Sequence, residues 1–307
     1  MPPAPHEAPA APDEVELRAG AYRASSTSHG GALASLRHEE RDLILPSGGA
    51  LGRPAYEGAI CAPWPNRVVD GRWRHRSVPQ DLVITEPQRG HALHGFVHDQ
   101  PWTLLTARED AVRWGLDTEP QPGYPWALSL ESAYRLDAAL GLTWDVTARL
   151  RPHPGAADGP APYGVAVHPY LVAGEGPAQR WTLELPAETV LLTDDRLTPR
   201  ELVPVAEAGL DLRRGPALGS QPLDHAFGDL SGSAARLRTS DGTGVEVSWP
   251  ERHRWVQVFT AQWDPLRPRD AVAIEPMTCP PDAFNSGTDL IWLGEEPVTL
   301  SWQIAAI

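Results

Sequence analysis

The sequence predicts an all-β protein made of antiparallel sheets, and three observations lead to this prediction. The 33 prolines and 27 glycines interrupt the chain so often that few windows are long enough for a helix. The segments between them are short and either alternate apolar with polar residues or are rich in β-branched and aromatic residues. Turn-forming residues separate these segments. Such a pattern is typical of an antiparallel sandwich or barrel, so we expect helix only as single turns.

The expected strands run along the whole chain. The clearest is 142–150, where Leu, Trp, Val, Ala and Leu alternate with Thr, Asp, Thr and Arg, as one buried sheet face requires. The other expected strands are 21–26, 111–116, 128–134, 163–167, 181–185, 245–249, 255–260, 271–274 and 298–304. Two stretches rich in Pro, Gly and polar residues, 151–162 and 210–222, are expected to be long loops.

Length and composition favour one domain. A chain of 307 residues with 41% hydrophobic residues and 12 tryptophans can bury a large core. β-sandwiches and barrels of about this size often form a single unit, and the chain has no internal repeat or linker. We therefore predict one domain over 14–307, preceded by a disordered arm of Pro and Ala at 1–13. This arm has neither the basic nor the apolar segment of a signal peptide, and no run approaches the length of a membrane span.

Charge and residue usage exclude several functions. A formal net charge of −14 argues against nucleic-acid or membrane-surface partners, because both are polyanions. All 26 basic residues are arginine, so Schiff-base chemistry, a pyridoxal-phosphate anchor and the lysine of a phosphate-binding loop are absent. The two cysteines, Cys61 and Cys279, lie far apart in the chain. Reduced thiols and a cytoplasmic location are the simpler interpretation.

The histidine-rich segment 90–98 raises the question of a metal. On a helix, His91, His94 and His98 would share one face, but Gly90 and Gly95 argue against that helix. No carboxylate or thiol follows at a ligand spacing, and the chain has no H-E-x-x-H, G-x-S-x-G or EF-hand pattern. We predict neither a bound metal nor a cofactor.

Four clusters of polar and aromatic residues are the candidates for a functional site. They are Pro-Trp-Pro-Asn-Arg at 63–67, Leu-His-Gly at 93–95, His-Pro-Tyr at 168–170, and Glu-Pro-Met-Thr at 275–278 followed by Pro-Asp-Ala-Phe-Asn at 281–285.

Each candidate residue also has a purely structural interpretation. His94 lies beside a glycine and could be a turn residue, and His168 could be a core histidine whose hydrogen bonds are satisfied. Arg67 could form a surface ion pair, and Asp224 could cap a turn. Glu275 differs, because it follows an apolar strand and precedes a proline that holds it extended. A carboxylate at such a strand end is costly unless it has a partner, which favours function.

Taken together and in this order, the clusters resemble the aldose 1-epimerase (galactose mutarotase) family. The family pattern has Asn-Arg followed by Gly and an aromatic residue, Leu-His-Gly, His-Pro-Tyr, Asp-His-x-Phe, and Glu-Pro-Met-Thr before Pro-Asp-Ala-Phe-Asn. The match extends from about Glu14 to the C-terminus, and the complete set is highly specific. The resemblance implies a large antiparallel β supersandwich and an enzyme that interconverts the α and β anomers of a free aldohexose without a cofactor.

The resemblance also implies roles for five residues. Glu275 would be the general base and His168 the general acid, while His94 would hydrogen-bond the sugar near the ring oxygen. Arg67 and Asp224 would bind sugar hydroxyls. A carboxylate and an imidazolium suit the opening of a hemiacetal, which loses a proton at one oxygen and gains one at the other. We expect the glutamate to be ionised at neutral pH and the histidine to be kept protonated by a nearby negative charge.

Three alternatives stay open. Relatives such as the hexose-6-phosphate epimerases carry arginine four residues after the Leu-His-Gly histidine, where this chain has His98, and this favours a neutral sugar. Four arginines nearby weaken that argument, namely Arg72, Arg74, Arg76 and Arg89. A non-catalytic sugar-binding protein would not need both an acid and a base. A glycoside hydrolase would need two carboxylates, for which Asp224 and Glu275 are available. The expected partner is a small sugar, and the sequence allows a monomer or a homodimer.

Overall fold

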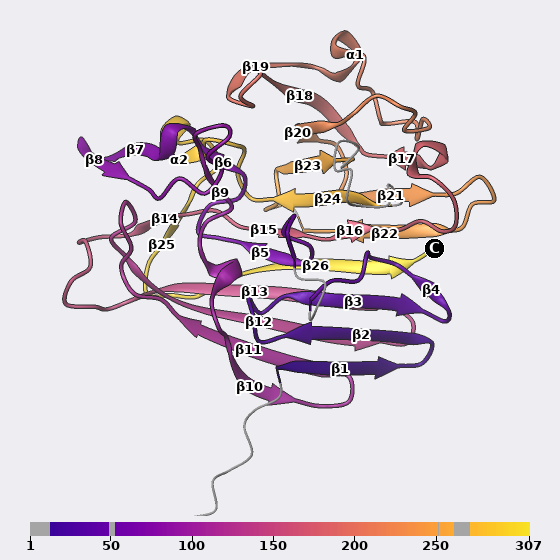
Figure 1. Ribbon diagram of the computed structural model, residues 1–307, viewed down its shortest axis with the longest axis horizontal. Coiled ribbons are helices and arrows are strands. Elements are labelled where there is room, and N and C mark those ends of the chain that lie inside the picture. Colours follow the sequence, from indigo (N-terminus) through magenta and orange to yellow (C-terminus); the bar gives the residue numbers. More distant parts are fainter. Residues whose placement is uncertain (1–12, 49–52, 251, 261–270) are drawn as a thin grey trace, which may run out of the picture.

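The computed structural model of the chain describes residues 13–48, 53–250, 252–260 and 271–307 (Figure 1). Nearly all of the predicted disordered arm lies outside these residues, and the single-domain boundary stays a prediction. The prediction of an all-β fold with single turns of helix is confirmed. In the described residues the α-helices are α1 (Val205–Ala208) and α2 (Ala283–Ser286), each four residues long. None of the described helices has the length and apolar character that crossing a membrane requires.

Two large antiparallel sheets form the body of the molecule (Figure 1). In spatial order the first contains β10 (Thr103–Ala107), β11 (Ala111–Asp117), β12 (Ala127–Asp137), β13 (Gly141–Arg151), β26 (Val298–Ala306), β22 (Gly244–Ser248), β21 (Ala234–Arg238) and β17 (Thr182–Glu184). The second contains β19 (Pro199–Pro204), β18 (Ala187–Thr193), β20 (Asp224–Leu230), β23 (Trp255–Phe259), β24 (Val272–Met277), β15 (Ala166–His168) and β5 (Ala59–Cys61), with β16 (Tyr170–Leu171) also paired to β24.

Smaller sheets and turns complete the fold. A four-stranded sheet contains β1 (Glu14–Ala19), β2 (Tyr22–Thr27), β3 (Leu33–His38) and β4 (Arg41–Asp42). Three strand pairs are β6 (Arg67–Val68) with β9 (Ala92–Leu93), β7 (Arg72–His75) with β8 (Val78–Asp81), and β14 (Ala161–Tyr163) with β25 (Ile291–Leu293). Single 3-10 turns are η2 (Val69–Gly71), η3 (Val97–Asp99) and η4 (Ala178–Arg180).

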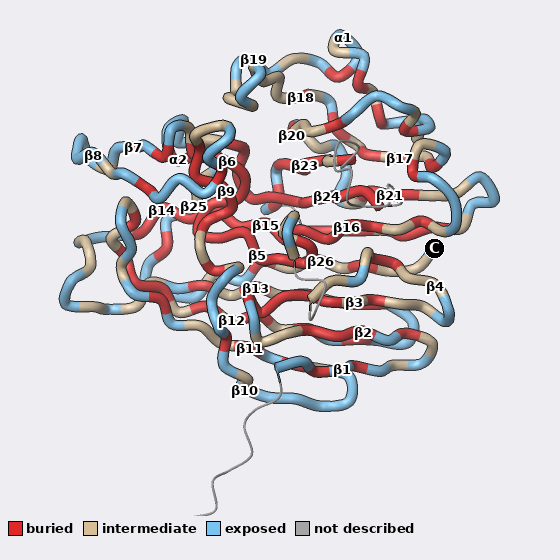
Figure 2. Tube along the Cα trace, in the orientation of Figure 1, coloured by how far each residue is buried: buried red, intermediate tan, exposed pale blue. Residues whose placement is uncertain are grey.

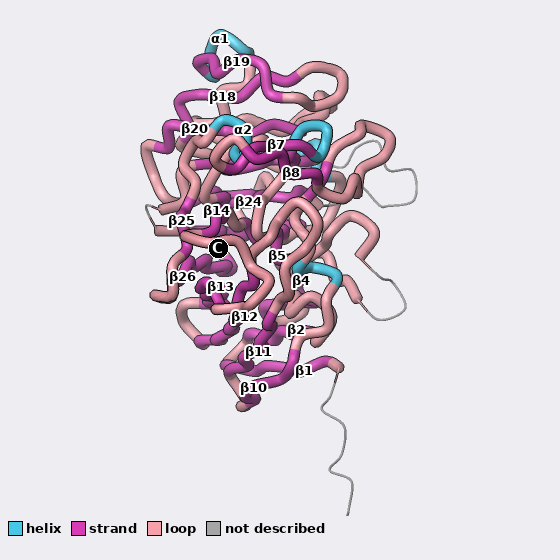
Figure 3. The backbone as a smooth tube through the Cα atoms, turned by 90° about the vertical axis from the view of Figure 1, so that its left-hand side faces the viewer, coloured by secondary structure: helices cyan, strands magenta, loops and turns pink. Residues whose placement is uncertain are grey.

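The core lies between the sheets and is rich in tryptophan. Along β13 buried and partly exposed positions alternate as the sequence predicted for 142–150. Trp144 on this strand lies opposite Trp302 of β26, and both are almost completely buried. The indole of Trp114 donates a hydrogen bond to Ser26 Oγ at 2.8 Å, which joins the first large sheet to the four-stranded sheet. Figure 2 shows buried segments concentrated in the central strands and exposed ones in the peripheral loops, and Figure 3 shows the strands and loops after a turn of 90°.

The prediction of one continuous strand over 163–167 is wrong. The chain forms β14 and then β15, and the two pair with different partners. Gly164 lies at the switch, where an added Cβ would lie 2.3 Å from the sulfur of Cys279. The backbone amide of Val165 donates to Thr278 Oγ1 at 2.9 Å instead of continuing a ladder. This side-chain partner, distant in sequence, lets the chain leave one sheet and enter the other.

The predicted strand over 271–274 is longer than expected. Strand β24 runs from Val272 to Met277, so Glu275 lies inside the strand and not beyond its end. Glu275 lies directly opposite Gln257 on the neighbouring strand β23. The two cysteines are buried free thiols, as predicted.

Candidate active site

The five residues selected from the sequence line one polar pocket. This pocket has a volume of about 260 Å³ and lies where the second large sheet meets the loops around β6 and β9. Its sequence-predicted lining residues are Arg67, His94, His168, Asp224 and Glu275. Further polar and aromatic residues line it as well, namely Tyr56, Asn66, Glu86, Gln88, Arg89, Tyr170, Gln257 and Phe259.

Four neighbouring strands of the second sheet supply one wall of the pocket. Asp224 begins β20, Gln257 lies on β23, Glu275 on β24, and His168 ends β15. Gln257 and Glu275 are direct cross-strand partners, so their side chains leave the same face of the sheet. The rigid sheet therefore sets the spacing of these polar groups.

Two turns with left-handed backbone supply further lining residues, Asn66 and His94. Asn66 and His94 have φ angles of 55° and 58°, and the amide of His94 donates to the carbonyl of Asn66. Gly95 follows with φ of 69°, and an added Cβ would lie 1.8 Å from the carbonyl oxygen of Ala62. Only glycine permits this close approach. The Leu-His-Gly motif thus fixes the direction of the imidazole of His94.

His168 and Glu275 are in direct contact. His168 Nε2 lies 3.2 Å from Glu275 Oε1, and both side chains are at most 5% exposed. Burial lowers the pKa of His168 to about 3. Burial, followed by the charge of Asp224, raises the pKa of Glu275 well above its usual value, and Arg67 only partly opposes this. The pocket therefore favours the uncharged form of each group, which differs from the charged resting pair expected from the sequence.

One tautomer of His94 is specified by its surroundings. The backbone amide of Asn66 donates to His94 Nδ1 at 3.1 Å, so this nitrogen must carry a lone pair. Burial, and next the charge of His168, lower the pKa of His94 well below its usual value. A neutral ring with an acceptor at Nδ1 has its proton on Nε2. His94 is consequently a hydrogen-bond donor through Nε2.

The same tautomer bears on metal binding. A nitrogen of His94, a nitrogen of His168 and an oxygen of Glu275 all lie within 4.8 Å of one another, a grouping that could hold a metal ion. A metal-bound histidine normally donates its other ring N–H to an acceptor. Here the other nitrogen of His94 accepts a hydrogen bond, so ligation through Nε2 would break this bond or require an imidazolate. The donor set suits acid and base chemistry better than a metal centre.

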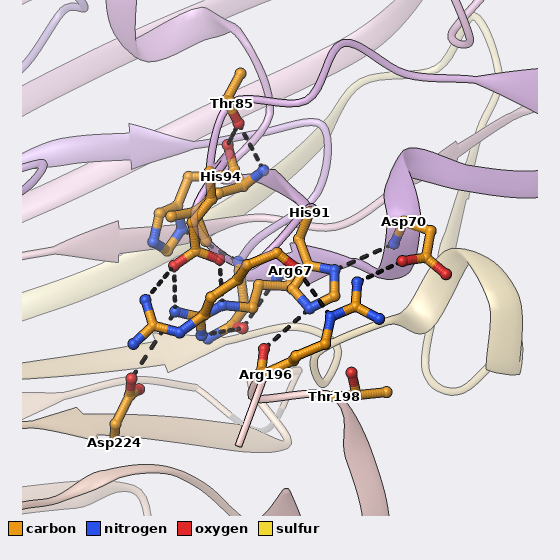
Figure 4. A network of polar contacts seen from close by, with 12 residues as sticks. Arg67, Asp70, Thr85, His91, His94, Arg196, Thr198 and Asp224 are labelled. Atoms are coloured by element: carbon orange, nitrogen blue, oxygen red, sulfur yellow. Dashed lines mark hydrogen bonds and ion pairs between the residues drawn. The ribbon is translucent and has the colours of Figure 1, made fainter. Parts of the chain in front are cut away.

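Arg67 is held by a buried carboxylate that the sequence interpretation missed. Its Nε and Nη2 donate to the two oxygens of Glu86 at 2.8 and 3.0 Å, and its Nη1 donates to Asn66 Oδ1 at 3.3 Å. Glu86 also accepts a hydrogen bond from Arg89 Nη1 at 2.8 Å. Arg67 Nη2 lies 3.8 Å from Asp224 Oδ2 on its other side (Figure 4).

Gln257 is a second residue that the sequence interpretation missed. Its side chain is buried, and its Nε2 lies 2.5 Å from Asp224 Oδ1. A carboxylate only accepts hydrogen bonds, so the amide nitrogen faces Asp224 and the amide oxygen points elsewhere. Among the described residues, neither Gln257 Oε1 nor Glu275 Oε2 has a hydrogen-bond partner. Two buried acceptors in a pocket wall are therefore available to a ligand.

Tyr56 packs against the imidazoles of His94 and His98. Its ring centroid lies 4.7 Å from that of His94 and 4.9 Å from that of His98. Its φ of 63° is unusual for a bulky residue, and such strain is often found at functional sites. His98, whose identity entered the argument for a neutral sugar, contacts Tyr56 but does not line the pocket.

His91 belongs to a structural network next to the pocket. Its Nδ1 accepts from the amide of Asp70 at 3.1 Å, and its Nε2 lies 2.9 Å from the carbonyl oxygen of Arg196. Arg196 Nη2 lies 2.5 Å from Asp70 Oδ1, which closes the network (Figure 4). Both ring nitrogens of His91 are occupied by backbone groups. His91 therefore has no free ring nitrogen to share with His94 and His98, and the three histidines of 90–98 form no common ligand face.

The residues missed from the sequence carried weak signals. Gln257 is the lone amide of the predicted strand 255–260 and has apolar residues on both sides, which could have marked it. Glu86 and Tyr56 lie in loops outside the four clusters, and nothing in their local sequence separates them from surface residues.

Comparisons with known proteins agree with this architecture. The family model described as aldose 1-epimerase matches residues 13–302. A protein of Escherichia coli K12 described as uncharacterized protein YihR is 30% identical over 279 residues, which cover 91% of this chain and 88% of that protein.

Two solved structures show the same fold at lower identity. A putative aldose 1-epimerase of Escherichia coli K12 has a TM-score of 0.83 and 19% identity, with 96% of this chain and 98% of that chain covered. A galactose 1-epimerase of Lactobacillus acidophilus NCFM has a TM-score of 0.80 and 19% identity, with 95% and 94% covered.

Proposed function

The chain belongs to the aldose 1-epimerase family, and from this premise we propose that it interconverts the α and β anomers of a free aldohexose. The observation that supports this proposal most is the contact between His168 and Glu275, an imidazole and a carboxyl group whose facing atoms lie 3.2 Å apart in a pocket of about 260 Å³. A protein that only bound sugar would have no need for this pair.

The pair holds one proton, and its two arrangements have the same net charge. Burial favours the proton on Glu275, with both groups neutral. Transfer across the 3.2 Å contact from Glu275 Oε1 to His168 Nε2 produces a carboxylate base and an imidazolium acid. The hydroxyl and ring oxygen of a bound hemiacetal stabilise this charged arrangement by hydrogen bonds.

Ring opening then follows from these two groups. Glu275 takes the proton of the C1 hydroxyl, the C1–O5 bond breaks as the C1=O1 double bond forms, and His168 gives its proton to O5. The open-chain aldehyde rotates about C1–C2. Reversal of the same transfers on the other face closes the ring as the second anomer and returns both protons. The reaction therefore consumes no cofactor, and positioned acid and base groups contribute about 10²–10⁴-fold each.

The remaining pocket residues provide complementary donors and acceptors for sugar hydroxyls. His94 Nε2 donates near the ring oxygen, as its tautomer requires. Arg67 donates, whereas Asp224 and Gln257 Oε1 accept. Mixed donors and acceptors suit hydroxyl groups, which both donate and accept.

Arg89 favours a second candidate, an aldohexose that carries a phosphate. Its side chain is 33% exposed at the pocket, and the Glu86 carboxylate that it contacts is already paired with Arg67. Two guanidinium groups thus share one carboxylate, which leaves Arg89 with donors for an anionic substituent. On the other side of Arg67, Asp224 restores the balance of charge, and for this reason we rank the neutral sugar first.

Polarimetry tests the proposal directly. Freshly dissolved α-glucose and α-galactose should relax faster to the anomeric equilibrium when the protein is added, and kcat/KM for glucose should exceed that for glucose 6-phosphate. The reverse ranking would establish the phosphorylated class. Binding of sugar without any acceleration would identify a binding protein, and release of sugar from a glycoside without acceleration would identify a hydrolase. Either of these last two results would contradict the proposal.

The paired titration predicts an unusual pH profile. The active pair carries one proton, so activity falls on acidification only when His168 gains a second proton, near its pKa of about 3. It falls on the alkaline side only above the raised pKa of Glu275. We expect kcat/KM to be constant from neutral pH down to at least about pH 5. The two charged neighbours of Glu275 shift its pKa in opposite directions, since Asp224 raises it and Arg67 lowers it. Polarimetric rates, corrected for the spontaneous reaction and accompanied by circular dichroism at each pH, measure this. An acid limb centred near the ordinary histidine pKa of 6.5 would disprove it.

A further inference from the structure

Glu86 is a buried carboxylate that belongs to none of the sequence clusters and has no assigned role. We propose that it is a positioning residue, which holds Arg67 away from Asp224 so that both can bind the sugar. This inference rests on the proposed function, because it concerns the same pocket.

Arg67 keeps two N–H groups that its protein partners do not use. A guanidinium has five N–H donors. Glu86 engages one at Nε and one at Nη2, and Asn66 engages one at Nη1. One N–H on each terminal nitrogen is left over. Arg67 lines the pocket, so these two donors are available to a ligand there.

Asp224 lies close to Arg67 but forms no hydrogen bond with it. Its Oδ2 lies 3.8 Å from Arg67 Nη2, which is too far for a hydrogen bond although the two charges are opposite. Glu86 holds the arginine from one side, and Gln257 holds Asp224 Oδ1 from the other at 2.5 Å. The two charged groups are therefore kept just out of contact, and one donor and one acceptor line the same pocket.

Glu86 is well suited to hold a cation in a fixed place. Its side chain is 4% exposed, and its residue pairs with His91 through backbone hydrogen bonds that close the 86–91 turn. Burial alone would raise the pKa of Glu86, but the hydrogen bonds and charges of Arg67 and Arg89 outweigh it and lower the pKa. The carboxylate thus stays ionised throughout the neutral range.

The inference has a clear structural rival. Glu86 could serve only to stabilise the loop between β8 and β9, with no influence on the sugar. In that case its replacement would lower stability but would leave KM unchanged in the folded fraction. If Glu86 acts through Arg67, its loss lets Arg67 pair with Asp224 and withdraws both groups from the ligand.

A double-mutant cycle separates these possibilities. We expect Glu86→Gln to raise KM, and the dissociation constant of a non-reacting sugar analogue, about 10- to 100-fold, because a charge-assisted hydrogen bond is worth roughly that factor. The effect on kcat should be smaller. In an Arg67→Gln background the same substitution should change KM by less than about 2-fold, because its target is gone. Equal effects in both backgrounds, or no rise in KM, would overturn the inference.

Control variants keep the result interpretable. Glu131→Gln is matched, since Glu131 accepts an equivalent two-nitrogen hydrogen bond from Arg113 at 2.6 and 2.5 Å but lies outside the polar pocket. It should leave KM and kcat unchanged. If Glu86→Gln does not fold, Glu86→Asp is the second variant. The aspartate retains the charge but is too short to bind both Nε and Nη2 of Arg67, so it should still raise KM. An unchanged KM would count against the inference.

The failure of the inference is distinguishable from failure of the proposed function. If the wild-type protein does not accelerate mutarotation, the proposed function fails, yet analogue binding measured by calorimetry still tests Glu86. If the wild type is active and Glu86→Gln retains its KM, only the inference fails.

Discussion

Replacing Glu275 by glutamine should reduce the enzymatic acceleration of mutarotation by about 10³-fold, within the range for loss of a general base. Glutamine has nearly the same shape, so the strand and its pairing with Gln257 should be retained. Its amide cannot accept the proton of the C1 hydroxyl as a carboxylate does. The measurement is the polarimetric relaxation of fresh α-glucose, with kcat and KM determined separately.

The expected loss is in kcat, with KM changed much less. Glu131→Gln, on β12 and outside the pocket, is the control and should retain wild-type rates. Circular dichroism should show the same fold for both variants. A Glu275→Gln protein that is folded and keeps more than about a tenth of wild-type kcat would rule out this residue as the base, since a general base contributes at least about 10²-fold.

Replacing His168 by glutamine should produce the second large effect, a fall in kcat of about 10²–10³-fold. The substitution removes the group that lies 3.2 Å from Glu275 Oε1 and delivers the proton to the ring oxygen in the proposed mechanism. The substitution also removes the partner that shares the proton of Glu275. Polarimetry on the same sugars measures this loss.

Combining the two substitutions provides a sharper criterion. Because His168 and Glu275 act as a unit, the double variant should be only slightly slower than the slower single variant. Multiplicative losses in the double variant would show two independent contributions and would contradict the shared-proton mechanism. The analogue dissociation constant serves as the control, and it should change much less than kcat in all three proteins.

Strands that bury one face were predictable from sequence. The alternation over 142–150 corresponds to β13 (Gly141–Arg151), and the segment 128–134 lies within β12 (Ala127–Asp137), where burial alternates as well. In these segments the period of two is a local consequence of side chains pointing to opposite faces. The break at Gly164 was not predictable, because it depends on Thr278 and Cys279, which are more than a hundred residues away.

The protonation of the site was predicted wrongly for a related reason. The carboxylate was expected to be ionised from its reference pKa in water, and the imidazole to be kept charged by a nearby negative charge. In the folded chain both groups are buried, and removal from water disfavours each charged form. Burial is a property of the packed sheets and loops, and no short motif encodes it.

The sequence by itself determined the fold class, the family and the five candidate residues, because strand periodicity and motif residues are carried locally along the chain. Only the tertiary structure decided that these residues share one pocket, that His168 touches Glu275, and that Asn66 selects the tautomer of His94. It also revealed Glu86 and Gln257 on either side of the Arg67–Asp224 pair. The physical reason is that hydrogen bonds and desolvation depend on distances of a few ångströms in space, which separation along the chain does not specify.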